Sequence, residues 1–100
     1  MKKADNDARD GLHKETFRDG KLSAVGRHSN GRKTGVWKFY FRNGLLRATG
    51  KLSGGQLDGL WKWYRENGKL YDVGKFVNGE KRGDWKYYDK RGKLIRTKKL

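Results

Sequence analysis

The sequence predicts an all-β fold, a single-layer antiparallel meander of stacked β-hairpins with no helix. Trp37, Trp61 and Trp85 lie 24 residues apart, and the residues around them recur at the same interval. Fourteen of the 15 glycines fall in four columns with this spacing. A fixed period of this length is typical of small units that bury their apolar faces only by stacking. The chain also lacks proline and any stretch with a helical period.

The period divides the chain into units 11–34, 35–58 and 59–82 and a partial unit 83–100. We predict a flexible N-terminal tail over residues 1–10 and one repeat domain over residues 11–100. The first unit resembles a capping repeat, because its glycines keep the period while His13 stands in the tryptophan column.

Each unit predicts one hairpin. In the second unit the mostly aromatic or β-branched segment 37–42 is followed by Asn43-Gly44, which is typical of a type I′ turn with positive φ at both residues. The returning strand covers about residues 45–51. A second turn at Gly54-Gly55 and a polar link of three residues then lead to the next unit. Over the whole chain this gives about seven strands.

Side chains alternate between the two faces of a strand, so each unit separates its tryptophan from its Lys-Tyr pair. We expect the tryptophan face to be the core, with leucines of the returning strands between the rings: Trp37, Trp61, Trp85, Leu46 and Leu70. The opposite face then carries the candidate partner-binding residues Lys38, Tyr40, Lys62, Tyr64, Lys86 and Tyr88.

Residues 35–55 and 59–79 share the pattern Gly-x-Trp-Lys-x-Tyr-x-x-Asn-Gly-Lys/Leu-Leu-x-x-x-Gly-x-x-x-x-Gly. This pattern resembles the MORN-repeat variant, and most closely the bacterial YwqK-like antitoxins of toxin–antitoxin systems. The resemblance covers roughly Gly11 to Leu94. It implies a MORN-like hairpin array and favours a non-catalytic module that docks a protein, in the manner of an antitoxin or immunity protein. MORN repeats at large also serve lipid binding, dimerisation and scaffolding, so fold does not fix function.

The formal net charge of +15 is spread over the units as +4, +3, +3 and +5, and residues 1–10 are neutral. Such a surface attracts anionic partners. We expect an acidic protein first, then single-stranded nucleic acid, then an anionic membrane surface. Three C-terminal cations, Arg91, Lys93 and Arg96, are expected to support the contact. The alternative is a structural scaffold whose lysines only keep one face soluble.

No catalytic residue, cofactor or metal site is predicted. The chain has no cysteine, and its two histidines lack ligand-like spacing. No carboxylate pair of the kind that acid–base catalysis needs stands out.

An open meander has two edge strands, so we expect a monomer or an edge-paired homodimer. The first ten residues contain no apolar segment of a signal peptide. A cytoplasmic location is therefore favoured, and removal of a signal peptide would instead indicate a secreted or envelope protein.

Overall fold

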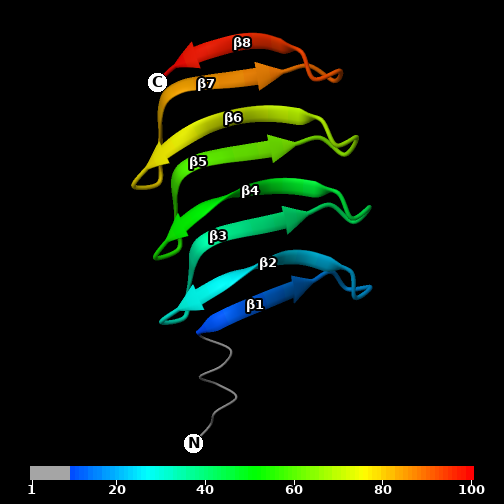
Figure 1. Ribbon diagram of the computed structural model, residues 1–100, viewed down its shortest axis with the longest axis vertical. Coiled ribbons are helices and arrows are strands. Elements are labelled where there is room, and N and C mark those ends of the chain that lie inside the picture. Colours follow the sequence, from blue (N-terminus) through cyan, green and yellow to red (C-terminus); the bar gives the residue numbers. More distant parts are fainter. Residues whose placement is uncertain (1–9) are drawn as a thin grey trace, which may run out of the picture.

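The computed structural model describes residues 10–100, which form an all-β fold without a helix. Eight antiparallel strands make one open sheet in chain order (Figure 1). This is one strand more than expected, because the partial last unit completes a hairpin. Residues 1–9 of the predicted tail lie outside the described residues. The strands are β1 (Gly11–Thr16), β2 (Leu22–Ser29), β3 (Arg32–Tyr40), β4 (Leu46–Ser53), β5 (Gln56–Tyr64), β6 (Leu70–Val77), β7 (Glu80–Tyr88) and β8 (Leu94–Lys99).

Two kinds of turn alternate along the chain, one at each end of the strands (Figure 1). The predicted type I′ turn at Asn43-Gly44 was wrong. Only Gly44 has a positive φ, and the Phe41 N–H donates to the Leu45 carbonyl at 2.9 Å. This is a three-residue turn that ends on a left-handed glycine. The tight turn with two positive φ values lies at the opposite end of the strands, as at Asn30 (54°) and Gly31 (78°). The predicted polar links therefore belong to strands.

Neighbouring hairpin turns are joined through asparagine side chains. Nδ2 of Asn43 donates to the Glu66 carbonyl at 3.0 Å, and Nδ2 of Asn67 donates to the Lys90 carbonyl at 3.0 Å. In the last unit Asp89 accepts hydrogen bonds from the backbone of the same turn, and the N–H of Lys93 contributes most to lowering the pKa of its carboxyl. The turns thus hold successive units in register.

The core lies on one side of the sheet, which we call the tryptophan face. Trp37, Trp61 and Trp85 are buried there. Each indole lies flat on a glycine of the preceding strand, because a Cβ on Gly50, for example, would come within 2.2 Å of the Trp61 ring. The indole N–H groups of Trp37 and Trp61 donate to backbone carbonyls at 3.0 and 2.9 Å. The glycine column is therefore a packing requirement.

Aromatic side chains, and not the two predicted leucines, fill the space between the tryptophans. Phe39 lies between Trp37 and Trp61, with ring centroids 6.0 and 6.1 Å away. Trp63 lies in the same way between Trp61 and Trp85, at 5.6 and 5.8 Å.

The prediction for Leu46 and Leu70 was wrong because each returning strand begins with a bulge. The strand pairing shifts between Phe39 and Tyr40, so that Tyr40 pairs with Leu46 and Arg47 is the extra residue. Directly paired residues share a face, so Leu46 lies with Tyr40 on the opposite side. The same shift pairs Tyr64 with Leu70.

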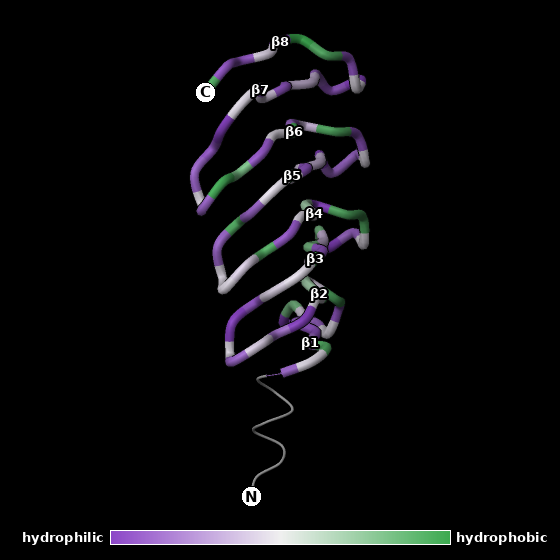
Figure 2. The backbone as a smooth tube through the Cα atoms, turned by 60° about the vertical axis from the view of Figure 1, so that its left-hand side comes forward, coloured by the Kyte–Doolittle hydropathy of each residue, from purple (hydrophilic) through white to green (hydrophobic). Residues whose placement is uncertain are grey.

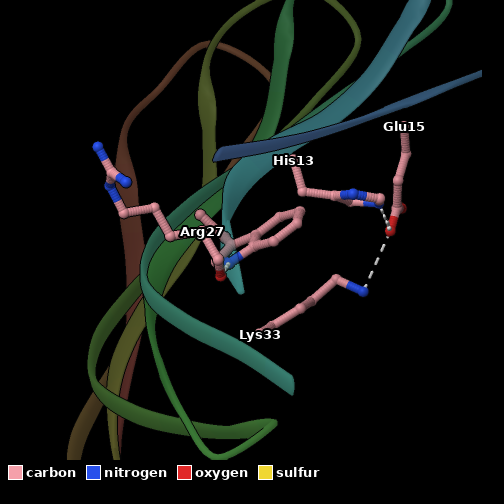
Figure 3. A network of polar contacts seen from close by, with 5 residues as sticks. His13, Glu15, Arg27 and Lys33 are labelled. Atoms are coloured by element: carbon pink, nitrogen blue, oxygen red, sulfur yellow. Dashed lines mark hydrogen bonds and ion pairs between the residues drawn. The ribbon is translucent and has the colours of Figure 1, made fainter. Parts of the chain in front are cut away.

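The first unit replaces core aromatics with histidines. His13 and His28 stack at 4.3 Å, and His28 stacks on Trp37 at 5.6 Å. Glu15 lies beside His13, 3.8 Å from its Nε2, and forms an ion pair with the Lys33 ammonium at 3.2 Å (Figure 3). The capping unit is therefore a more polar copy of the same packing.

Candidate functional site

The second side of the sheet carries a row of lysines, and we call it the lysine face. Strand pairing places eight residues in one line across the sheet, in which lysines alternate with smaller side chains: Lys14, Val25, Lys38, Thr49, Lys62, Val73, Lys86 and Thr97. Successive lysines lie two strands apart, which corresponds to about 10 Å. The row therefore spans the whole sheet.

The ammonium groups of this row find no charged or aromatic partner in the described part of the chain. Lys14, Lys38 and Lys86 are exposed, and Lys62 is half-buried. Within residues 10–100 none of the four forms an ion pair or lies over an aromatic ring. Their charge is available to a partner.

A second row on the lysine face combines tyrosine and leucine. Tyr40, Tyr64 and Tyr88 are half-buried and pair with Leu46, Leu70 and Leu94. Hydrophobic segments recur at the beginnings of β4, β6 and β8, where these leucines lie (Figure 2). Each tyrosine thus lies next to the lysine row and beside a leucine of the returning strand.

A third row on the same face is apolar and exposed. Leu12 is 61% exposed, Val36 64% and Leu60 57%. Around the first two, an open hollow of about 410 Å³ extends to Thr34 and Lys38. Lysine, tyrosine and aliphatic side chains therefore share one continuous surface.

We expected Arg91, Lys93 and Arg96 to support the lysine row, but the structure places none of them in that row. Arg91 lies in the turn between β7 and β8, and Lys93 follows it before β8 begins. Arg96 pairs with Tyr87 and lies over its ring at 4.8 Å, which places it on the tryptophan face. The pairing shift between Tyr87 and Tyr88 moves Leu94, as it moves Leu46 in the second unit. Arg96 lies inside this bulge and keeps the position that Ala48 has in the second unit.

Sequence reasoning missed Lys14 as a member of the row. The signal was present, because Lys14 precedes Lys38 by one period of 24 residues. The degraded first unit therefore keeps its rung of the lysine row although it has lost its tryptophan.

Residues 10–100 contain no group of three or more histidine, cysteine or acidic side chains placed to hold a metal ion. No helix in this part is long and apolar enough to cross a membrane.

Comparison with known families gives a match in the centre of the array. Residues 33–52 and 57–78 match the family model described as MORN repeat variant. Searches of the curated proteins and of the solved structures gave no match. Two repeats of this β-hairpin array are thus similar to MORN repeat variants, as their phased Trp-Lys-x-Tyr motifs indicated.

Proposed function

We propose that the protein is a non-catalytic binding module whose lysine face docks an acidic protein, in the manner of an antitoxin or immunity protein. The observation that carries this proposal is the row of four lysines, which form no ion pair with any other residue between 10 and 100. The two MORN-like repeats support a repeat module of this kind. A rigid row of like charges at fixed spacing suits a surface that carries complementary carboxylates.

The neighbouring rows favour a protein over a simple polyanion. Protein interfaces combine an apolar centre with charged groups around it. Leu12, Val36 and Leu60 supply exposed apolar groups beside the lysines. Phosphate backbones offer no complementary surface for such side chains.

Single-stranded nucleic acid is the second candidate, because the tyrosine row lies beside the lysine row. Lysines that follow a phosphate backbone and aromatic rings on which bases stack are the usual means of binding single strands. An anionic membrane surface would use the lysines alone. A purely structural scaffold would need neither row.

The test is capture of partners from host lysate at about 150 mM salt, where long-range attraction is largely screened, with and without nuclease. The variant reverses three charges of the row, Lys38→Glu, Lys62→Glu and Lys86→Glu. A matched control reverses three exposed turn residues, Arg18→Glu, Lys69→Glu and Lys90→Glu. Both lower the net charge from +15 by the same amount.

The proposal expects one acidic protein that survives nuclease, is lost with the row variant and is kept by the turn control. Loss of the captured material on nuclease treatment would identify nucleic acid as the ligand. Equal loss with both variants would show that only total charge matters. Unchanged capture by the row variant would support the scaffold.

A further inference from the structure

A small pocket lies on the tryptophan face, away from the lysine row. It has a volume of about 250 Å³ and is lined by Trp63, Tyr71, Asp72, Phe76, Lys81 and Trp85. Four of these six side chains are aromatic, and one is a carboxylate. The pocket is open to solvent on one side, so a small ligand has access to it.

The lining of this pocket departs from the earlier units at three positions. Asp72 occupies the column that holds Ala24 and Ala48 in the earlier units. Among residues 10–100 it is the charged residue that is buried. Phe76 replaces Leu52, and Tyr71 replaces Arg47. These three departures from the repeat all line the same pocket.

The carboxyl of Asp72 is buried in the wall of the pocket. It is 8% exposed, and its Oδ1 has no hydrogen-bond partner within residues 10–100. Burial raises the pKa of this carboxyl, and the Lys81 ammonium partly opposes that effect. A buried acceptor without a partner costs free energy unless something satisfies it.

A cation already rests against the pocket wall. The Lys81 ammonium lies 4.6 Å from the centroid of the Trp85 ring. Lys81 is exposed and comes from the start of β7, so its long side chain can leave without disturbing the sheet. It shows that positive charge is accepted at this position.

We propose that this pocket is a binding site for a quaternary ammonium group. Aromatic faces attract such a cation through their quadrupoles, and the group loses little hydration on entry. Trp63, Phe76 and Trp85 supply the aromatic wall, and Asp72 supplies the opposing charge. The ligand takes the place of the Lys81 ammonium.

The test uses choline chloride as the probe, with sodium chloride at equal ionic strength as the reference. Binding is followed by the indole N–H signals in a two-dimensional NMR titration. The Trp63 and Trp85 signals are expected to shift and saturate, while the Trp37 signal serves as an internal control. The neutral isostere 3,3-dimethylbutan-1-ol is expected to cause no comparable shift, since it lacks the charge.

Two variants probe the charges. Asp72→Ala restores the residue of the earlier units, so the fold is expected to persist, and affinity for choline falls at least about tenfold. Lys81→Met removes the competing ammonium, so affinity rises. Absence of a saturable shift in both the natural protein and Lys81→Met would overturn the proposal. So would an equal response to the neutral isostere, or unchanged affinity in Asp72→Ala.

A parallel titration with phosphatidylcholine vesicles distinguishes a soluble ligand from a lipid headgroup. Binding of choline without binding of vesicles indicates a small soluble molecule. Vesicle binding that choline displaces indicates the headgroup. Either result supports a quaternary ammonium site, and vesicle binding that choline leaves unchanged contradicts it.

Discussion

The three glycines beneath the indoles decide where the tryptophans lie. A Cβ on Gly26 or Gly50 would come within 2.2 Å of the ring above, and one on Gly74 within 2.0 Å. Real side chains do not approach so closely, so the ring or the strand would have to move. Residues without a side chain thus determine the packing of the largest ones.

Gly50→Ala is therefore expected to reduce the free energy of unfolding by about 1–3 kcal/mol, as other overpacked cores do. Lys98→Ala is the matched control, because Lys98 stands in the same column on β8, where the structure places no indole. Its effect should stay within about 0.5 kcal/mol. Urea unfolding of both variants measures the difference, and equal losses would contradict this account of the glycine column.

Asp72 should make stability depend on pH. Its pKa is raised above the ordinary 3.8 in the folded state, mainly by burial. The ionised form is thus disfavoured by folding, and stability contributed by this group is lost as pH rises through the folded pKa. Asp72→Asn is expected to melt at a higher temperature than the natural protein at pH 7, and the gap should close toward pH 3. A gap in melting temperature that widens at low pH would show that folding lowers the pKa of Asp72 instead of raising it.

The role of a residue could be predicted only where the residue followed the 24-residue period. The tryptophan column and the lysine row follow from spacing alone, and the same comparison would have found Lys14. Asp72 breaks its column, which held Ala24 and Ala48, so periodicity gave no role for it. The role of Asp72 depends on the side chains around it, and only the folded sheet brings those side chains together.

The hairpin is the element in which sequence reasoning was partly wrong. Alternation placed Trp37 and Tyr40 on opposite faces, as the structure has them, but it failed after the turn. The bulge at Arg47 adds one residue, which moves Leu46 to the lysine face, and the bulge in the last hairpin does the same to Leu94. A bulge leaves no mark in a pattern of alternating polarity, because it depends on the backbone twist at the turn.

The turns also allow a prediction at this scale. Gly68 has φ 90°, a conformation that β-branched residues strongly disfavour. Gly68→Val should cost about 2 kcal/mol of unfolding free energy. Glu66→Val, in the same turn, should be nearly neutral because only the backbone of Glu66 holds the neighbouring unit. Thermal unfolding tests the pair, and similar melting temperatures would contradict the assigned turn.

Residues 10–100 form a thin plate of 54 × 32 × 14 Å in which each strand pairs only with its neighbours along the chain. Stability in such arrays is a sum of local terms. All side chains of β8 are exposed, whereas β4 and β6 each contain several buried residues. Opening should therefore begin at the β8 end.

Hydrogen exchange followed by NMR measures this gradient. Hydrogen-bonded amides of β8 are expected to exchange at least about tenfold faster than those of β4 and β5. Amides of β8 that do not bond to β7 are left out of the comparison, since they lack protection in any case. Uniform protection from β4 to β8 would indicate a single cooperative unit.

The asparagine bonds between turns have a consequence for the length of the plate. Asn43 reaches the carbonyl of Glu66, and Asn67 reaches that of Lys90, so each contact spans the same 23 residues. A tandem copy of segment 35–58 would carry its own asparagine, glycine and indole to the next unit, and would meet the same partners. The chain is thus built like a ruler with equal divisions: insertion of one division lengthens the plate by a hairpin and adds one more lysine to the row.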